Sequence, residues 1–302
     1  MTLSRHPAVD LVSVFAAGPG GGNPAPVVID AAGMSDTEMQ EVARHYGHES
    51  AFVLPAPSGS TCDYEFRFWV PNHEMSMCGH ATVGAVWLLH RAGRLRGDRL
   101  IIQTASGQVE GRIVGHSAED GAAVEIFQPA GGLAPLPEAP HIREEILDVL
   151  GITEAQLAPL PIQNAWTSRV KTLIPLASTT DLDALRPRFE KMEALCDKIG
   201  STGLYPYAPV DAGRQIFDAR QFPRASGYPE DAATGIAASA LSFGLLANGL
   251  VEASERAITI RQGRAMKRPS QISVRFTIEE DRLTGCWLGG PVRFEAEDGA
   301  PS

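Results

Sequence analysis

An internal repeat is the feature of this 302-residue chain that most constrains how it can fold. Residues 78–81 (CGHA) align with residues 234–237 (TGIA) at an offset of 156 residues (235 − 79). The same offset aligns residues 92–95 (AGRL) with residues 248–251 (NGLV), and each glycine follows an apolar helical run where a left-handed cap is expected. The repeat therefore predicts two similar halves that face each other.

The two copies differ at their ionisable side chains. Four such residues align with residues that do not ionise near neutral pH: Glu49 with Tyr205, His80 with Ile236, Cys78 with Thr234, and Asp231 with Met75. A cleft between the halves would therefore be symmetric in its backbone and asymmetric in its chemistry. Such a cleft suits the directional transfer of a proton.

Composition places the chain among soluble globular proteins with two domains. It is 44% hydrophobic and 21% charged, and 302 residues are enough for two domains of about 150 residues each. A segment rich in proline and glycine at residues 130–140 marks the expected boundary. We expect an N-terminal domain over residues 1–130, to which C-terminal strands can cross over, and a C-terminal domain over residues 131–302.

Charge and cysteine content argue against several kinds of partner and site. The net charge of −10 argues against nucleic acid, because phosphate binding needs a concentrated basic surface. The four cysteines form no Cys-x-x-Cys pair, so neither a disulfide framework nor a zinc ribbon is indicated, and no metal site is expected. No stretch reaches the roughly 18 apolar residues that a membrane helix needs. We expect a soluble cytoplasmic protein without a membrane partner.

Hydrophobic periodicity predicts an α+β fold with mixed sheets, in which each half wraps one apolar helix. Ser35 and Glu38 form a capping box that predicts a helix through about Tyr46. Further helices are expected at residues 78–91, 182–199 and 235–247. Strands are expected, among others, at residues 9–15, 25–29, 50–54, 64–70, 170–176, 204–210 and 215–222.

Glu49 is the candidate acid–base residue of the first half. It stands at a helix-to-strand junction, directly before the apolar residues 50–54. A half-buried carboxylate loses hydration, which disfavours its charged form and raises its pKa toward the range where it both takes and gives a proton near pH 7. The alternative is a solvated glutamate at a helix end, since charged side chains are usually exposed.

The motif at residues 78–82 (CGHAT) begins a long apolar helix. The free backbone N–H groups and the positive dipole end of such a helix can hold a carboxylate, and Gly79 allows the ligand to approach closely. His80 can donate or relay a proton, and Cys78 at the same end can be a thiolate. The alternatives are a structural histidine that only caps or packs, and a cysteine that serves as a small apolar residue.

Residues 230–237 (EDAATGIA) form the corresponding element of the second half. Asp231 precedes a small-residue turn, and Thr234 and Gly235 lead into the second apolar helix. Taken alone, Asp231 can be a helix cap or a partner of the helix dipole. The repeat instead predicts that this loop faces the cleft that holds Glu49 and His80.

Together these motifs resemble the PhzF-like family, the phenazine-biosynthesis isomerases that share the diaminopimelate epimerase fold. The matching segments run in family order along the whole chain: residues 22–25 (GNPA), 49–52 (ESAF), 78–82 (CGHAT), 230–235 (EDAATG), 262–263 (QG), 268–270 (RPS) and 289–292 (GGPV). No segment is decisive alone, whereas their joint order and spacing are specific.

The resemblance implies two pseudo-symmetric domains, each a mixed β-sheet wrapped around a central helix, with the active site between them. It implies no metal and no organic cofactor, and family members are commonly homodimers. In the best-known member, a glutamate moves a proton between ring carbons of trans-2,3-dihydro-3-hydroxyanthranilate, and Glu49 matches that glutamate. His80 and Asp231 match residues that hold the substrate and help to pass protons. Gly79 and Gly235 match the backbone donors.

Two residues depart from the family pattern. Ile236 stands where the family often has a serine that binds the substrate, and His48 stands where the residue before the glutamate is usually small and hydroxylic. Losing a donor aimed at a polar substrate group typically costs about 1–3 kcal/mol, which puts the phenazine precursor in doubt as the natural substrate. Cys78 has no cysteine facing it in residues 231–234, so racemisation by two thiols is disfavoured.

The sequence supports the hypothesis of a cofactor-independent isomerase that shifts a proton within a small, carboxylate-bearing unsaturated amino or hydroxy acid. Glu49 acts as base and then acid, and His80 and Asp231 orient and polarise the substrate. The expected substrate-binding residues are Asn23, His48, Cys78, Gly79, Thr234, Gly235 and Ile236. Two alternatives stay open: an enzyme of the same fold with an epimerase, lyase or C–C hydrolase outcome, and a ligand-binding member without catalysis.

Overall fold

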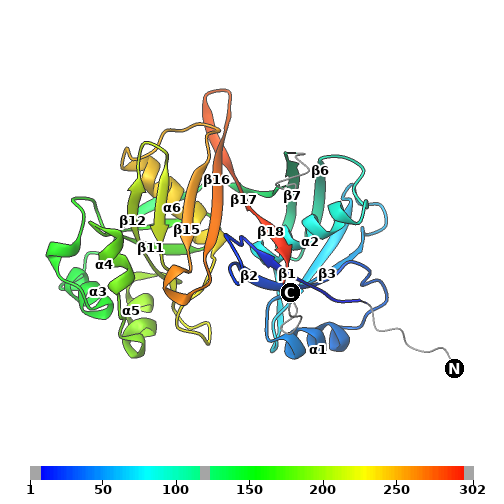
Figure 1. The fold of residues 1–302 in the computed structure, drawn as a ribbon, viewed down its shortest axis with the longest axis horizontal. Coiled ribbons are helices and arrows are strands. Elements are labelled where there is room, and N and C mark those ends of the chain that lie inside the picture. The colour runs from blue at the N-terminus through cyan, green and yellow to red at the C-terminus, as the bar shows by residue number, and fades with distance from the viewer. Residues whose placement is uncertain (1–7, 116–122, 296–302) are drawn as a thin grey trace. The chain divides into compact units, whose positions relative to one another are not determined.

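The computed structural model describes residues 8–115 and 123–295 (Figure 1). The chain divides into two compact units: unit 1 combines residues 1–127 with residues 289–302, and unit 2 is Gln128–Leu288. The C-terminal strand β18 (Val292–Phe294) belongs to unit 1 because it pairs antiparallel with β1 (Asp10–Val14). The expected second domain, residues 131–302, differs from unit 2 at its C-terminal end, because this long-range pairing returns the chain to the first unit.

Unit 1 is built on a mixed sheet. Across this sheet the strands lie in the order β18, β1, β2 (Asn23–Val28), β3 (Ser50–Pro55), β4 (Tyr64–Trp69), β6 (Arg99–Thr104), β7 (Gly107–Val114) and β8 (Ala123–Pro129). The β2–β3 and β4–β6 pairs are parallel, and the other neighbours are antiparallel. The short strand β5 (Glu74–Met75) pairs antiparallel with β4.

Unit 2 repeats this topology. Its strands lie in the order β9 (Gly132–Pro135), β10 (Gln163–Trp166), β11 (Val170–Pro175), β12 (Gly203–Asp211), β13 (Ile216–Ala219), β15 (Ile258–Gln262) and β16 (Ser270–Glu279). The β11–β12 and β13–β15 pairs are parallel, at the places equivalent to β2–β3 and β4–β6. The two-residue strand β14 (Phe222–Pro223) also pairs with β12, and β17 (Arg282–Gly290) precedes β18. The repeat in the sequence is therefore a repeat of strand order.

One apolar helix packs against each sheet. α2 (Gly79–Arg91) contacts β1, β2 and β3, and α6 (Gly235–Ala247) contacts β10, β11 and β16. Both helices have 13 residues, and the predicted bounds agree with the structure to within one residue. Gly93 and Gly249 follow the two helices with φ of 65° and 69°. No helix in the part of the chain that the structure describes is long and apolar enough to cross a membrane.

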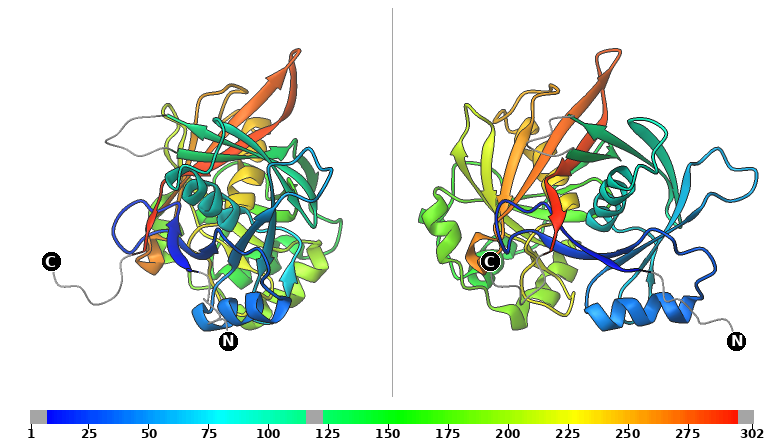
Figure 2. Two further views of the ribbon diagram at one scale, coloured as in Figure 1. Left: turned by 90° about the vertical axis from the view of Figure 1, so that its right-hand side faces the viewer. Right: turned by 45° about the vertical axis from the view of Figure 1, so that its right-hand side comes forward.

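Shorter helices cover the other face of each sheet. In unit 1, α1 (Asp36–Tyr46) lies across the sheet from α2 (Figure 2), and Met39 and Ala43 pack against Phe52 of β3. The predicted capping box is confirmed, because the Ser35 hydroxyl accepts from the Glu38 N–H while the Glu38 carboxylate accepts from the Ser35 N–H. Unit 2 carries three such helices: α3 (Ile142–Leu150), α4 (Thr179–Ala184) and α5 (Met192–Ile199).

The prediction of one helix over residues 182–199 is wrong. α4 ends at Ala184 and α5 begins at Met192. Pro187 lies between them, and its ring excludes helical geometry from the preceding residue and removes one backbone donor. The sequence prediction also lacks α3 and β10, which pack or pair with elements that are distant along the chain.

Gly263 is expected to be the more sensitive of two glycines that both have a left-handed backbone. Its φ is +77°, and a Cβ atom there would lie 2.1 Å from the Arg268 carbonyl oxygen and 2.8 Å from that of Ala232. Gly249 has φ of +69° and open space around the same position. Gly263→Ala should lower the free energy of unfolding by about 3 kcal/mol, and Gly249→Ala by about 1 kcal/mol, because only the first adds a clash with rigid backbone. Urea unfolding measures both values, and equal losses would contradict the close approach of the Arg268 and Ala232 carbonyl groups to Gly263.

Candidate functional site

Glu49 lies at the junction between α1 and β3 in unit 1. Gly47 ends α1 with φ of 70°, and the chain enters β3 at the buried Ser50 three residues later. This turn holds the Glu49 side chain at 25% exposure. The carboxyl group is therefore partly screened from water and still open to a ligand.

His80 lies in the first turn of α2, between a thiol and a carboxyl group. Its Nε2 atom is 3.9 Å from Glu49 Oε2, and its Nδ1 atom is 3.5 Å from Cys78 Sγ. The His80 side chain is 10% exposed, and Cys78 is buried. An imidazole in this position can exchange protons with either neighbour, because its two ring nitrogens can donate or accept. The structure thus brings Glu49, His80 and Cys78 together in unit 1.

The start of α2 is not capped by a side chain. Within the described chain, the side chain of the N-cap residue Cys78 accepts no hydrogen bond from the first turn. The start of a helix favours an anion through its backbone N–H groups and its dipole. A Cβ atom at Gly79 would have Ile126 Cδ1 at 3.9 Å as its nearest neighbour, so space remains beside this glycine. Asn23, the first residue of β2, and His48, before Glu49, are both half-buried.

Asp231 and Thr234 occupy the equivalent position in unit 2. Thr234 is the N-cap residue of α6, so Asp231 is not the cap. The Thr234 hydroxyl donates to Asp231 Oδ2 at 2.5 Å, and the Asp231 N–H donates to the Gln221 carbonyl at 3.1 Å. The first turn of α6 is tighter than that of α2, because a Cβ atom at Gly235 would lie 2.7 Å from Leu288 Cδ2. Ile236, half-buried, takes the place that His80 has in unit 1.

Gln262 fixes this loop, and the sequence hypothesis gave it no role. Its Nε2 atom donates to the Asp231 carbonyl at 2.7 Å and to Thr234 Oγ1 at 3.2 Å. Its Oε1 atom accepts from the Tyr205 hydroxyl at 2.9 Å. Burial raises the pKa of Tyr205, so its hydroxyl stays protonated and remains a donor. The available signal was the matching pair of residues 262–263 at the end of an alternating strand.

Arg220 anchors the same loop through Glu230. Its guanidinium forms two parallel hydrogen bonds to the Glu230 carboxylate, at 2.9 and 2.7 Å, and both side chains are about nine-tenths buried, at 8% and 10% exposure. The remaining Arg220 nitrogen donates to the carbonyls of Leu182 and Leu185 at the end of α4. The residue before Asp231 is thereby tied to another element of unit 2.

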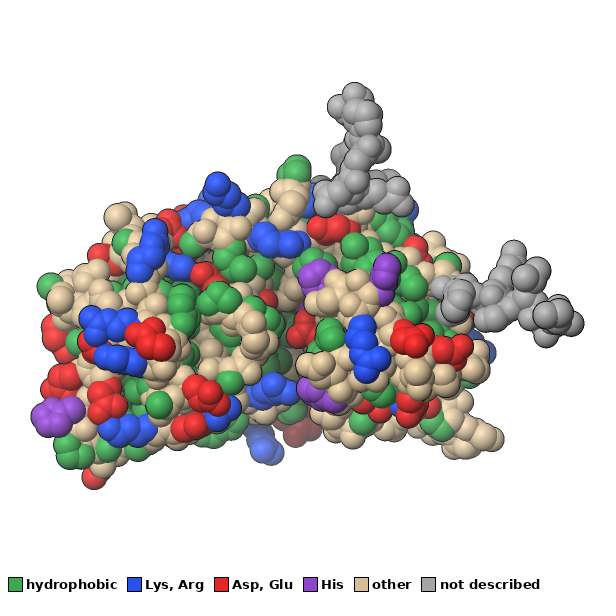
Figure 3. Space-filling model, turned by 90° about the horizontal axis from the view of Figure 1, so that it is seen from below, with side chains coloured by type: hydrophobic (Ala, Val, Ile, Leu, Met, Phe, Trp, Pro, Cys, Tyr) green, Lys and Arg blue, Asp and Glu red, His purple; other side chains and the backbone are tan. Residues whose placement is uncertain are grey.

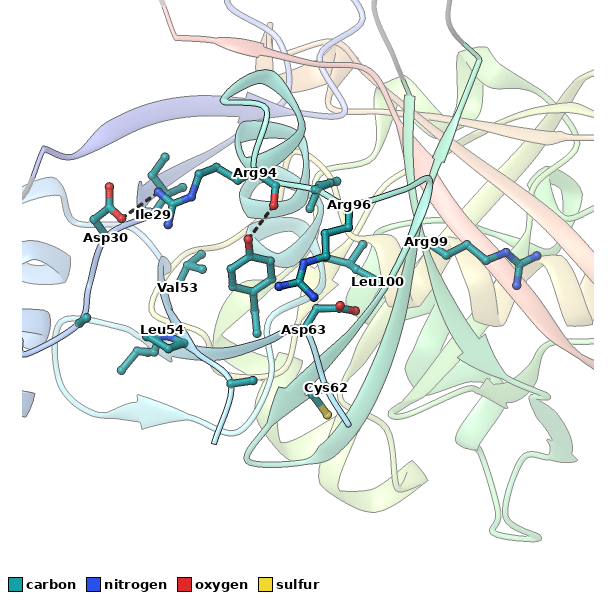
Figure 4. Close-up of a pocket in the computed structure, with 15 residues that line it drawn as sticks. Ile29, Asp30, Val53, Leu54, Cys62, Asp63, Arg94, Arg96, Arg99 and Leu100 are labelled. Carbon is teal, nitrogen blue, oxygen red and sulfur yellow. Dashed lines mark hydrogen bonds and ion pairs between the residues drawn. The ribbon is translucent and has the colours of Figure 1, made fainter. Parts of the chain in front are cut away.

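A pocket of about 430 Å³ lies on unit 1 and is separate from these residues (Figure 4). Its charged lining residues are Asp30, Asp63, Arg94, Arg96 and Arg99. Arg94 pairs with Asp30 at 2.8 Å, so this pair carries little net charge. None of the residues expected in the site lines the pocket, and we do not include it in the candidate site.

Comparison with known proteins identifies the relatives of this chain. Residues 12–288 match the family model for phenazine biosynthesis-like proteins. The uncharacterized isomerase YddE of Escherichia coli K12 is 33% identical over 298 residues, which cover 96% of this chain and 98% of the relative. The trans-2,3-dihydro-3-hydroxyanthranilate isomerase of Pseudomonas chlororaphis is 30% identical over 284 residues, 93% and 94% of the two chains. A PhzF-family structure from Bacillus anthracis has a TM-score of 0.84 at 24% identity. The match covers 95% of this chain and 96% of the Bacillus anthracis chain.

The fold and these relatives define the class of protein: an isomerase with an α+β fold of the diaminopimelate epimerase type. The chain belongs to the phenazine biosynthesis-like family, known as PhzF. The resemblance found in the sequence and the predicted fold class are both confirmed.

Arg220→Ala should destabilise the protein far more than the loss of an exposed arginine. It leaves the buried Glu230 carboxylate without its partner, which typically costs about 3–5 kcal/mol of unfolding free energy. Arg224 is the matched control, because it pairs with Asp197 at 38% and 56% exposure, and such pairs contribute about 1 kcal/mol or less. Figure 3 shows that acidic and basic side chains lie interspersed on the face that it draws, so an exposed pair of this kind is common on the surface. Denaturation in urea at pH 7 measures both, and a similarly small loss for the two variants would contradict the anchoring role.

Proposed function

We propose that this chain is a cofactor-independent isomerase that moves a proton within a small, unsaturated amino or hydroxy acid carrying a carboxylate. The observation that carries the proposal is the 3.9 Å approach of His80 to the Glu49 carboxyl group, beside the uncapped start of α2. The name of the Pseudomonas chlororaphis relative, trans-2,3-dihydro-3-hydroxyanthranilate isomerase, supports the reaction class, an isomerisation of an unsaturated hydroxy amino acid. An acid–base pair next to an anion-binding helix end suits this reaction class.

In the proposed reaction, Glu49 first acts as a base. It takes a proton from a saturated carbon, and the electron pair left behind spreads into the neighbouring unsaturated system. The protonated Glu49 then returns the proton to a second carbon of the same molecule, so the product is an isomer and no electrons are gained or lost. His80 exchanges a proton with a polar group of the substrate while this charge develops.

The other residues bind the substrate in this proposal. The backbone N–H group at Gly79 holds its carboxylate, because the positive end of a helix favours an anion. Asp231, fixed by Thr234, orients the amino or hydroxyl group, and Asn23 completes the lining.

Ile236 favours a substrate that differs from the phenazine precursor in the group that contacts this residue. A branched apolar side chain there offers no hydrogen bond, and an unmatched polar substrate group costs about 1–3 kcal/mol. His48 adds a bulky, titratable group directly before Glu49. We therefore propose a substrate that is apolar where it meets Ile236.

Glu49→Gln should remove catalysis while the substrate still binds. The amide keeps the size of the side chain and cannot carry the proton, so turnover should fall by at least about 100-fold. The substrates to assay are trans-2,3-dihydro-3-hydroxyanthranilate and a panel of unsaturated hydroxy and amino acids. NMR of the products in deuterated water separates an isomer from an epimer, an elimination product or a cleaved chain, and the isomer should carry solvent deuterium.

Glu41→Gln is the matched control, because Glu41 is an exposed glutamate on α1. It should leave turnover unchanged. Full turnover in Glu49→Gln would exclude the proposed mechanism. Binding of panel members without any turnover by the wild type would favour a ligand-binding protein.

A further inference from the structure

Lys171 is a buried lysine of unit 2 that the proposed mechanism does not use. It lies in β11 at 5% exposure, whereas the chain's other lysines are Lys191, Lys198 and Lys267. Lys191 and Lys198 form surface ion pairs with Asp148 and Glu145, and Lys267 is exposed. Among the residues that the structure describes, the Lys171 ammonium group has no hydrogen bond or ion pair, whereas its backbone pairs with Ala165 of β10. A buried ammonium group is costly unless nearby charges or a ligand compensate it, so its position needs a reason.

The alternation of β11 places Lys171 on the sheet face that α6 covers. A Cβ atom at Gly244 of α6 would lie 2.3 Å from Leu173 Cδ1, so Leu173 points toward α6. Lys171 is two residues earlier in the same strand and therefore shares that face. Thr172 points to the opposite face, where its hydroxyl donates to Asn164 Oδ1 at 2.7 Å. β11 and β12 run side by side with α6 next to them (Figure 1).

The Gln221 side chain lies against Gly203, the residue of β12 that is next to Lys171. Because Thr172 is opposite Leu204 in the parallel β11–β12 pair, Lys171 is next to Gly203. A Cβ atom at Gly203 would lie 2.4 Å from Gln221 Nε2, so the missing side chain makes room for the Gln221 amide. Gln221 is 1% exposed, and neither polar atom of its amide has a hydrogen-bond partner in the described chain. A buried amide in this state points to a functional use, since such groups are nearly always paired.

Gln221 also leads directly to Asp231. Its carbonyl oxygen accepts the Asp231 N–H at 3.1 Å, and the two residues form an isolated β-bridge. The Lys171 and Gln221 side chains therefore lie on the strand face beside the loop that carries Asp231. Gly203 is the position that permits this arrangement.

The charge of Asp231 acts on Lys171. Burial lowers the pKa of Lys171 to about 8, and the attraction of Asp231 is the largest effect in the opposite direction. Arg169, in the turn before β11, lowers this pKa further, and Cys196 of α5 raises it. At neutral pH the lysine is therefore an ammonium ion whose charge depends on Asp231.

We propose that Lys171 is a positioning residue of the proposed active site, whose buried ammonium group attracts the Asp231 carboxylate and orients it before the start of α6, with Gln221 lining the same buried site. This inference rests on the proposed function. In this proposal, Lys171 acts through Asp231 and does not contact the reacting atoms of the substrate. Loss of its proton above about pH 8 removes the positive charge and weakens the hold on the carboxylate.

The first test measures the titration of the lysine side chains by NMR and therefore needs no substrate. The chain has four lysines, whose signals can be resolved after labelling with ¹³C at the ε carbon. One of the four signals, that of Lys171, should titrate near pH 8 because burial lowers its pKa. Lys171→Met, similar in length and uncharged, assigns that signal by removing it. In Asp231→Asn the signal should titrate at lower pH, because the attraction of the carboxylate is lost. A Lys171 signal near the usual lysine value of about 10.4, or one unmoved by Asp231→Asn, would overturn the inference.

Kinetics provide the second test. The wild-type kcat should decline as the pH rises through about 8, and Lys171→Met should lower kcat about 10-fold at neutral pH, leave KM nearly unchanged and abolish that decline. Lys198→Met is the matched control, because it removes one exposed lysine of a surface pair and should keep the wild-type profile. A Lys171→Met enzyme with wild-type kcat and pH profile would exclude the positioning role.

The two proposals fail in different ways. If Glu49→Gln stays active while the Lys171 signal responds to Asp231→Asn, the proposed function is wrong and the coupling of Lys171 with Asp231 stands. If Glu49→Gln is inactive while the Lys171 signal ignores Asp231, only the positioning inference is wrong.

Discussion

The burial of one apolar helix in each unit is the constraint on which the rest of the structure depends. α2 and α6 are apolar on nearly all sides, so each needs a sheet that curves around it. The middle turns of each helix are buried against its sheet, and the first turn lies at one end of the helix. In the described chain, the side chains of Cys78 and Thr234 do not cap these first turns, and the start of a helix favours an anion.

The two units use the same backbone for different chemistry. Unit 1 places His80 between the Glu49 carboxyl group and the Cys78 thiol, an arrangement that suits the proton transfer we propose. Unit 2 has Ile236 at the equivalent position. Its polar side chains Thr234 and Gln262 instead form hydrogen bonds to Asp231. The two units share their strand topology, and they differ in the side chains at the starts of α2 and α6.

The polar interior of unit 2 is more elaborate than stability requires. A bidentate Arg220–Glu230 pair, the Tyr205–Gln262 hydrogen bond and the buried Lys171 all lie next to the loop before α6. Buried ionic and polar groups contribute little net stability, because desolvation offsets their attraction. Their concentration beside Asp231 supports the proposal that this carboxylate is held in one orientation.

The sequence alone determined the repeat, the bounds of both central helices, the α1 capping box and the candidates Glu49, His80 and Asp231, because periodicity, caps and internal alignment are local properties. The break at Pro187 was also visible there, and the prediction overlooked it. Only the tertiary structure decided which side chains meet: Gln262 and Asp231 are 31 residues apart, Arg220 and Leu182 are 38, and β18 returns to β1 from the far end of the chain. Such contacts follow from strand register and sheet closure, which no local pattern of residues specifies.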